Sequence, residues 1–310
     1  MIITSIFLKF YKMSKTILSF KNISKNYSNI EALRQISFDI PANSIFGILG
    51  ANGSGKSTFM KILPGLIQDW SGEIFHNGKF VEKNNIKLRD KFGYLIEAPT
   101  FYEYLSARKN LEILSRISPS NSLDIDYILE LVNLQNRSED KVSAYSYGMK
   151  QRLGIAQCLI HNPEILILDE PNNGLDPNGI QDMIKLIKNL RTEGKTICLS
   201  THNLRDVEEL CTHFTVFQNG ENSQTCSMEE QIKDSKTWLV NTQDIDSAIE
   251  KLKNSDVFKI ISVFNKNILI ESKEKQSLDV IHNILSDVEV YKISKESNLI
   301  GYFDASKANS

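Results

Sequence analysis

A glycine-rich loop directly behind an apolar stretch constrains this chain more than any other feature of its sequence. Residues 45–49 read Ile-Phe-Gly-Ile-Leu, and residues 50–58 read Gly-Ala-Asn-Gly-Ser-Gly-Lys-Ser-Thr. The pattern G-x-x-x-x-G-K-S between a strand and a helix is typical of a loop whose backbone N–H groups surround phosphate oxygens. An ordinary glycine-rich turn is the alternative, but four such positions coincide by chance in only ~1% of chains of this length. The loop therefore predicts an α/β fold that binds a nucleotide.

The residue types of this loop have separate expected roles. The Lys56 ammonium can reach the outer phosphates of a nucleotide, and the Ser57 hydroxyl can bind Mg²⁺. The helix that follows directs the positive end of its dipole at the same phosphates. The other nucleotide contacts are expected from Gly50, Asn52, Gly53, Ser54, Gly55 and Thr58.

Composition sets broader limits. The 310 residues are 41% hydrophobic and 24% charged, values typical of a soluble globular protein, and the length suggests about two domains. A net charge of −2 gives no general attraction for nucleic acid. The four cysteines form no C-x-x-C pair, which favours free thiols in a reducing cytoplasm. No apolar run approaches the ~18–20 residues that a membrane-spanning helix needs.

Strands and helices alternate through the first two thirds of the chain. Residues 164–168 and 196–200 are apolar runs typical of strands buried on both faces of a parallel sheet. Other strands are expected at residues 16–23, 36–40, 72–75, 79–81 and 92–97, and helices at 102–135 (with breaks at Pro119 and Asn121), 148–160 and 178–191. The helix after the glycine loop is expected to run to about residue 67, with a bend or stop at Pro64. This order predicts a mostly parallel α/β core.

The pattern changes near residue 221. Residues 223–236 are polar and are expected to form a linker. Residues 237–304 show a β-α-β-β-α-β order, which favours a small ferredoxin-like α+β domain. The remaining expected segments are an N-terminal extension or product of an upstream start codon at residues 1–13, the nucleotide-binding domain at 14–222 and a frayed tail at 305–310.

Two adjacent carboxylates form the second chemical motif. Asp169 and Glu170 follow the buried apolar run, at the end of the strand where parallel sheets place their ligands. Asp169 can hold Mg²⁺ opposite Ser57, and Glu170 can orient a water molecule and accept its proton. A solvated acidic turn is the alternative, and the glycine loop upstream disfavours it.

A third segment, residues 145–152, reads Tyr-Ser-Tyr-Gly-Met-Lys-Gln-Arg. It resembles the signature of the ATP-binding cassette (ABC) ATPases, usually Leu-Ser-Gly-Gly-Gln followed by Gln-Arg. Ser146 and Gly148 match, whereas Tyr147 and Met149 depart. The resemblance covers about residues 16–220. It implies the P-loop ABC cassette, a mostly parallel sheet with an antiparallel β-subdomain and a helical subdomain. It also implies that Ser146 and Gly148 contact the γ-phosphate of ATP bound on a second copy; a plain helix cap at Ser146 is the alternative.

Other positions match this family one by one. Asp176 resembles the D-loop aspartate, in the loop that links the two ATP sites of a dimer. His202 resembles the switch histidine that hydrogen-bonds the γ-phosphate. Tyr27 resembles the aromatic residue that stacks on adenine, although packing within a turn is a nearly equal alternative. The histidines that match no motif, and are expected to be structural, are His76, His161, His213 and His282.

One departure from the family carries chemical information. After residues 92–96 the family usually has Gln, which contacts Mg²⁺ and the attacking water and senses the transport subunit, but this chain has Glu97. A carboxylate there adds negative charge beside the triphosphate. Glu97, followed by Ala-Pro and aromatic residues, resembles the lantibiotic-immunity and bacitracin-export subgroup. The resemblance thus assigns Glu97 to the catalytic and metal site.

The function implied by the resemblance is that of the ATP-binding and ATP-hydrolysing subunit of a multi-subunit exporter of an antimicrobial peptide or drug. Its cofactors are ATP and Mg²⁺, and its partners are a separate integral-membrane permease and a second cassette, at the cytoplasmic face of the membrane. A cassette ATPase acting on ribosomes or DNA is the alternative, which the single cassette and the lack of heptads or basic excess disfavour. The intact Lys56, Asp169 and Glu170 disfavour a non-enzymatic module, and a P-loop kinase needs no signature segment.

Overall fold

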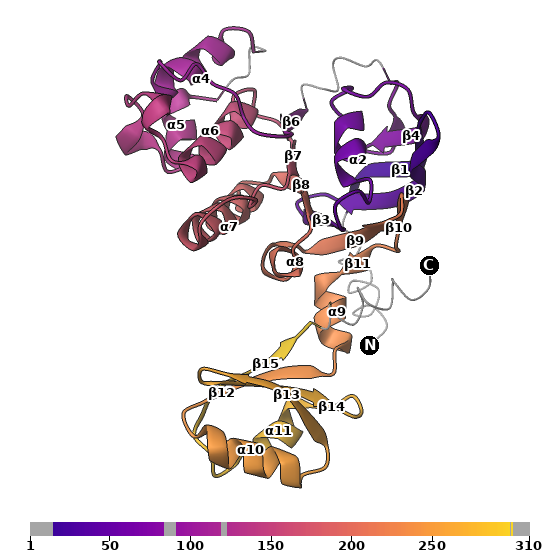
Figure 1. Ribbon diagram of the computed structural model, residues 1–310, viewed down its shortest axis with the longest axis vertical. Helices are drawn as coiled ribbons and strands as arrows, with labels where there is room; N and C mark the ends of the chain where they lie inside the picture. Colours follow the sequence, from indigo (N-terminus) through magenta and orange to yellow (C-terminus); the bar gives the residue numbers. More distant parts are fainter. Residues whose placement is uncertain (1–14, 84–90, 119–122, 298, 300–310) are drawn as a thin grey trace, which may run out of the picture. The chain divides into compact units, whose positions relative to one another are not determined.

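The structure is a computed structural model that describes residues 15–83, 91–118, 123–297 and 299. The chain divides into two compact units, Met1–Thr225 and Cys226–Ser310 (Figure 1). The expected N-terminal extension, the expected tail and the helix breaks expected at Pro119 and Asn121 lie outside the described residues. Within those described ranges, no helix has both the length and the apolar character needed to cross a membrane.

Unit 1 begins with an antiparallel sheet of order β2-β1-β4-β5. Its strands are β1 (Thr16–Tyr27), β2 (Ile30–Pro41), β4 (Ser71–His76) and β5 (Lys79–Phe80). The β1–β2 hairpin is longer than the predicted strands 16–23 and 36–40, because pairing continues to Tyr27 and Ile30 at the turn. Most side chains near this turn are exposed, so the sequence there lacks the apolar alternation that identifies a strand.

The second sheet of unit 1 has the order β10-β9-β3-β8-β7-β6. Its strands are β3 (Ile45–Leu49), β6 (Phe92–Leu95), β7 (Ile165–Asp169), β8 (Thr196–Thr201), β9 (His213–Gln218) and β10 (Glu221–Asn222). Strands β6, β7, β8, β3 and β9 pair in parallel, and β10 pairs antiparallel with β9. This confirms the predicted mostly parallel core. The carboxyl ends of β3, β7 and β8 share one edge, where the glycine loop, Glu170 and His202 follow.

The hydrophobic core of unit 1 joins the two sheets and α2 (Lys56–Ile62). Five buried rings lie at its centre, with neighbouring centroids 4.9–6.2 Å apart: Phe20, Phe38, Phe46, Phe59 and Phe217. Removing one buried ring of this kind costs about 3–5 kcal/mol of stability. The end of α2 at Ile62 agrees with the stop expected at Pro64, and the longer run to residue 67 was wrong.

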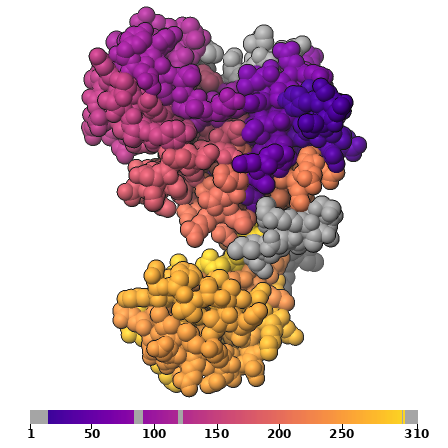
Figure 2. All heavy atoms as spheres, in the orientation of Figure 1, coloured from indigo at the N-terminus to yellow at the C-terminus, as the bar shows by residue number. Residues whose placement is uncertain are grey.

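Apart from α2, the helices described in unit 1 form a lobe and a pair. The lobe contains α4 (Ala107–Ser115), α5 (Ile125–Leu131) and α6 (Tyr147–Leu159), with short 3₁₀ turns at Gln135–Arg137 and Val142–Ala144; the pair is α7 (Pro177–Thr192) and α8 (Leu204–Leu210). Figures 1 and 2 show the lobe, coloured purple to magenta, as one compact mass. Each of these five helices begins at a side chain that accepts a first-turn N–H, namely Ser106, Asp124, Ser146, Asp176 and Asn203.

Unit 2 contains an antiparallel sheet of order β13-β14-β12-β15. Its elements are β12 (Thr237–Thr242), α10 (Ile245–Asn254), β13 (Phe258–Phe264), β14 (Asn267–Ser272), α11 (Leu278–Ile284) and β15 (Val290–Glu296). Helices α10 and α11 cover one face of the sheet, in the β-α-β-β-α-β order of ferredoxin-like folds (Figure 1). The fully buried side chains of the core between these helices and the sheet include Val240, Leu252, Ile268, Ile270 and Ile281.

The segment at residues 223–236 differs from the expected linker. It contains β11 (Cys226–Ser227) and α9 (Met228–Asp234). In α9 only Met228 is buried, so the helix has no apolar stripe by which a sequence pattern could identify it.

Candidate functional site

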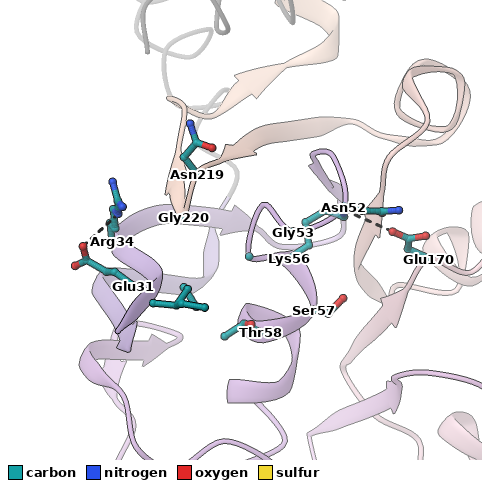
Figure 3. Close-up of a pocket in the computed structure, with 13 residues that line it drawn as sticks. Glu31, Arg34, Asn52, Gly53, Lys56, Ser57, Thr58, Glu170, Asn219 and Gly220 are labelled. Carbon is teal, nitrogen blue, oxygen red and sulfur yellow. Dashed lines mark ion pairs between the residues drawn. The ribbon is translucent and has the colours of Figure 1, made fainter. Parts of the chain in front are cut away.

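A pocket of about 700 Å³ opens beside the glycine loop. Figure 3 shows Asn52, Gly53 and Lys56 on the loop side and Glu170 facing them from the end of β7. Ser57 and Thr58 continue the lining along α2. The remaining lining residues are Ile30, Glu31, Ala32, Arg34, Gly55, Asn219 and Gly220. The pocket therefore brings segments from far apart in the sequence to the edge where the parallel strands end.

The glycines of the loop are required by its backbone. Gly55 has φ of +106°, and a Cβ atom there would lie 2.7 Å from the Ala32 carbonyl oxygen. Gly53 has φ of +82°, and no atom of the described residues lies within 4 Å of the position of a Cβ, so backbone conformation favours glycine there. The turn ends at Lys56, where α2 begins.

Lys56 is the buried cation of the pocket, with 4% of its side chain exposed. Its ammonium donates to the carbonyl oxygens of Gly50 at 2.7 Å and Ala51 at 3.1 Å, and lies 3.6 Å from Glu170 Oε1. Hydrogen bonds and an opposite charge satisfy this cation inside the fold. Ser54 Oγ, also in the loop, is buried without a hydrogen-bond partner among the described residues. The loop thus offers a cation and a hydroxyl to an anionic ligand.

The two carboxylates after β7 have different environments. Asp169 Oδ1 accepts a hydrogen bond from the Ser200 hydroxyl on β8, and the backbone N–H of Glu170 donates to the same hydroxyl at 3.0 Å. Glu170 Oε2 lies 3.0 Å from His202 Nδ1. Glu170 has φ of +47°, a left-handed conformation that costs a non-glycine residue about 1–3 kcal/mol. Neighbouring groups therefore hold Glu170 in a strained backbone turn that aims its side chain at Lys56 and His202.

A divalent metal fits the oxygen donors of this edge. Mg²⁺ takes hard oxygen ligands, usually one or two from protein and the rest from phosphates and water. Ser57 lines the pocket, and Asp169 is at the end of β7 with one carboxylate oxygen already held by Ser200. Among the described residues no group of three or more acidic, His or Cys side chains could hold a metal by itself. The donor set suits a metal shared with a nucleotide rather than an all-protein metal centre.

The resemblance implies that the Glu97 side chain contacts Mg²⁺ and the attacking water, but in the structure it contacts Lys61. Its carboxylate pairs with Lys61 Nζ on α2 at 2.6 Å, and 70% of its side chain is exposed. The hydrogen bond and charge of Lys61 lower the pKa of Glu97, which keeps the carboxylate ionised at neutral pH. In this structure the carboxylate therefore faces a lysine, and the described lining of the pocket does not include it.

Tyr27 also lies outside the pocket lining that the structure describes. Tyr27 is 45% exposed, and the ammonium of the buried Lys25 lies 4.6 Å from its ring centroid. The residues that line this end of the pocket are Ile30, Glu31, Ala32 and Arg34, and sequence reasoning missed all four. No motif marks them, because the fold of the β1–β2 hairpin brings them to the loop.

The signature residues Ser146 and Gly148 and the D-loop residue Asp176 lie outside the described lining of the pocket. Ser146 caps α6 by accepting the Met149 N–H at 3.3 Å, and Asp176 caps α7 by accepting the Gly179 N–H at 2.8 Å. Ser146 and Asp176 are exposed, and Gly148 is partly exposed. Within the described part of the chain, none of these three lines the pocket.

A second, smaller hollow of about 210 Å³ adjoins His202 and the segment at 172–175. The buried Asp206 carboxylate accepts from Asn172 Nδ2 at 3.0 Å and from the Thr201 hydroxyl at 2.7 Å. These hydrogen bonds tie the segment after Glu170 to the residues around His202. Sequence reasoning missed Asp206 and Asn172, although an acidic residue on the helix after His202 was a usable signal.

Comparison with known proteins places the cassette in a family. Residues 33–173 match the family model described as ABC transporter. The chain is 33% identical over 282 residues to the uncharacterized ABC transporter ATP-binding protein YhcH of Bacillus subtilis, covering 90% of this chain and 92% of that one. It is 41% identical to the bacitracin transport ATP-binding protein BcrA of Bacillus licheniformis, over 66% of this chain and 68% of the relative. It is 40% identical to the lantibiotic transport ATP-binding protein SrtF of Streptococcus pyogenes, over 62% and 83%.

Solved structures agree with these relatives. CbiO1 of Clostridium perfringens, part of the ABC transporter complex cbiONQ, has a TM-score of 0.63 and 28% identity, covering 70% of this chain and 90% of that chain. The dimeric cassette MJ0796, in a post-hydrolysis state with ADP and Pi, has a TM-score of 0.60 and 24% identity. The match covers 68% of this chain and 99% of that chain, and it supports the assignment of the fold. The chain belongs to the ABC transporter family, as an ATP-binding subunit that hydrolyses ATP.

Proposed function

We propose that this chain powers the export of an antimicrobial peptide of the bacitracin or lantibiotic class. The similarity to the bacitracin and lantibiotic transport proteins supports this class of cargo. The alternative of a cassette ATPase acting on ribosomes or DNA has no comparable support. ATP hydrolysis in the chain would then supply the free energy, and a separate membrane protein would bind the peptide.

Glu170 is the general base in this proposal. The observation that carries it is the position of the Glu170 carboxylate, 3.0 Å from His202 Nδ1 and 3.6 Å from Lys56 Nζ at the wall of the pocket. Lys56 would bind the outer phosphates, and His202 the γ-phosphate. Glu170 would accept a proton from the attacking water at its carboxylate.

Mg²⁺ would be held by the Ser57 hydroxyl and, through water, by Asp169. When bound, it neutralises charge on the phosphate oxygens during transfer to water. The Ser200 hydrogen bond keeps the Asp169 carboxylate in place for this role. Glu97 would join the metal site only after leaving Lys61, its partner here.

A second copy of the chain would complete each ATP site. Ser146, Gly148 and Asp176 support this, because they are exposed or partly exposed at helix starts and are not among the described residues that line the pocket. Helix starts offer N–H groups and a positive dipole end to phosphate. The dimeric cassette among the solved structures shares this fold.

A membrane permease is the second proposed partner, which would hold the chain at the cytoplasmic face of the membrane. Tyr102 and Tyr104, before α4, are 52% and 68% exposed and pack edge to face with ring centroids 6.2 Å apart. Exposed aromatic pairs of this kind are typical of protein interfaces. They support docking of the permease on the helical lobe.

The substitution Glu170→Gln tests the proposed role of the base. We expect turnover to fall at least about hundredfold, because the amide cannot accept the proton of water. ATP should still bind and should convert the variant to a stable dimer, measured by light scattering after gel filtration. Near-normal phosphate release by this variant would contradict the assignment of Glu170.

A further inference from the structure

We propose that Ser200 is a positioning residue for ATP hydrolysis, one buried hydroxyl that orients both Asp169 and Glu170. This inference rests on the roles proposed above for those two carboxylates. Every residue of β8 is buried, and Ser200 is 0% exposed. A hydroxyl at such a position is tolerated only when it is hydrogen-bonded, so the partners of Ser200 indicate what it holds in place.

The partners of Ser200 are two successive residues of the neighbouring strand. Ser200 stands opposite Asp169 in the parallel register of β7 and β8. Its hydroxyl donates to Asp169 Oδ1 and accepts the Glu170 backbone N–H at 3.0 Å. Because a hydroxyl has one proton and two lone pairs, Ser200 can donate to Asp169 and accept from the Glu170 N–H at the same time.

Each of these two hydrogen bonds holds a different part of the site: one the Asp169 carboxylate, the other the backbone of Glu170. The bond to Asp169 fixes one carboxylate oxygen and leaves the other for a metal ion or its water. The bond to Glu170 holds the N–H of the residue whose φ is +47°, at the turn that directs its carboxylate to Lys56 and His202. Loss of the hydroxyl would therefore disturb the metal ligand and the base together, without touching the glycine loop.

The variant Ser200→Ala separates this role from nucleotide binding. We expect the Mg²⁺ concentration for half-maximal binding of mant-ATP to rise severalfold and kcat to fall about tenfold, the effect of one lost hydrogen bond to a charged group. Binding of mant-ATP in EDTA should stay unchanged. Ser200→Thr keeps the hydroxyl and should restore the Mg²⁺ dependence.

Thr215→Val is the matched control. Thr215 lies on β9, is also 0% exposed and donates its hydroxyl to the Ser223 carbonyl at 2.7 Å, away from the carboxylates. We expect the Mg²⁺ dependence of mant-ATP binding in Thr215→Val to equal that of the unmodified chain. If Ser200→Ala does not fold, Ser200→Cys keeps the size with a much weaker hydrogen-bonding group and should show the same loss.

Two results would overturn the proposal. One is an unchanged Mg²⁺ dependence and kcat in folded Ser200→Ala or Ser200→Cys. The other is an equal loss in Thr215→Val, which would indicate a general effect of buried hydroxyls on stability. Failure of the proposed function is a separate outcome, because it requires Glu170→Gln to retain turnover whatever Ser200 variants do.

Discussion

The two groups of residues that the family resemblance assigns to ATP are held by the chain in opposite ways. On the glycine-loop side, Lys56 is buried and donates to backbone carbonyl oxygens, and Asp169 accepts a hydrogen bond from the buried Ser200. On the signature side, Ser146 and Asp176 are exposed, and the side chain of each accepts a first-turn N–H of its own helix. The chain thus builds one half of a site internally and leaves the other half open to solvent. This difference supports the proposal that the second half acts on another copy.

A substitution in the buried half of the site, on the glycine-loop side, should have the largest effect on ATP binding. Lys56→Ala removes the one ammonium that lies inside the loop, and we expect the Kd for ATP to rise more than about tenfold, with hydrolysis lost. Equilibrium binding of mant-ATP measures this directly. Lys61→Ala is a useful control, since Lys61 pairs with Glu97 on the exposed side of α2. Equal affinities in the Lys56 variant and the unmodified chain would contradict the account of the buried half.

A substitution in the exposed half of the site, on the signature side, should leave the affinity for ATP almost unchanged but remove hydrolysis. Among the described residues, an added Cβ at Gly148 meets only the Leu175 side chain, at 3.5 Å, so the free chain has room for a Cβ there. We expect Gly148→Asp to lower kcat about hundredfold, because its charge would repel a phosphate brought by the second copy. ATP affinity of the single chain should change less than about twofold. A large loss of affinity at equal unfolding temperature would place Gly148 in the binding half instead.

The sequence predicted those parts of the site whose residues are contiguous. The glycine loop needs backbone turns that only glycine allows, and two acids directly after a buried apolar run are visible without any tertiary information. The parallel core followed from the same apolar runs, and the family assignment is confirmed. Local chemistry therefore predicted a parallel α/β fold that binds a nucleotide, and the resemblance of residues 145–152 to a known signature supplied the family.

The rest of the site depends on which strands become neighbours. Ser200 touches Asp169 only because β8 pairs with β7, and Arg34 reaches the pocket only because the β1–β2 hairpin packs beside the loop. Glu97 meets Lys61 across 36 residues of sequence. The sequence did not predict the polar helix α9, because a helix that buries a single side chain has no periodic pattern of apolar residues.

The measurement that tests the central claim most directly is ATPase activity after mixing two inactive variants. Glu170→Gln keeps an intact signature half, and Gly148→Asp keeps an intact glycine-loop half. If the halves meet across two copies, a mixed dimer contains one complete site. We predict that combining the two chains before adding ATP restores hydrolysis that neither shows alone. Activity of the mixture equal to the sum of the separate variants would contradict the account.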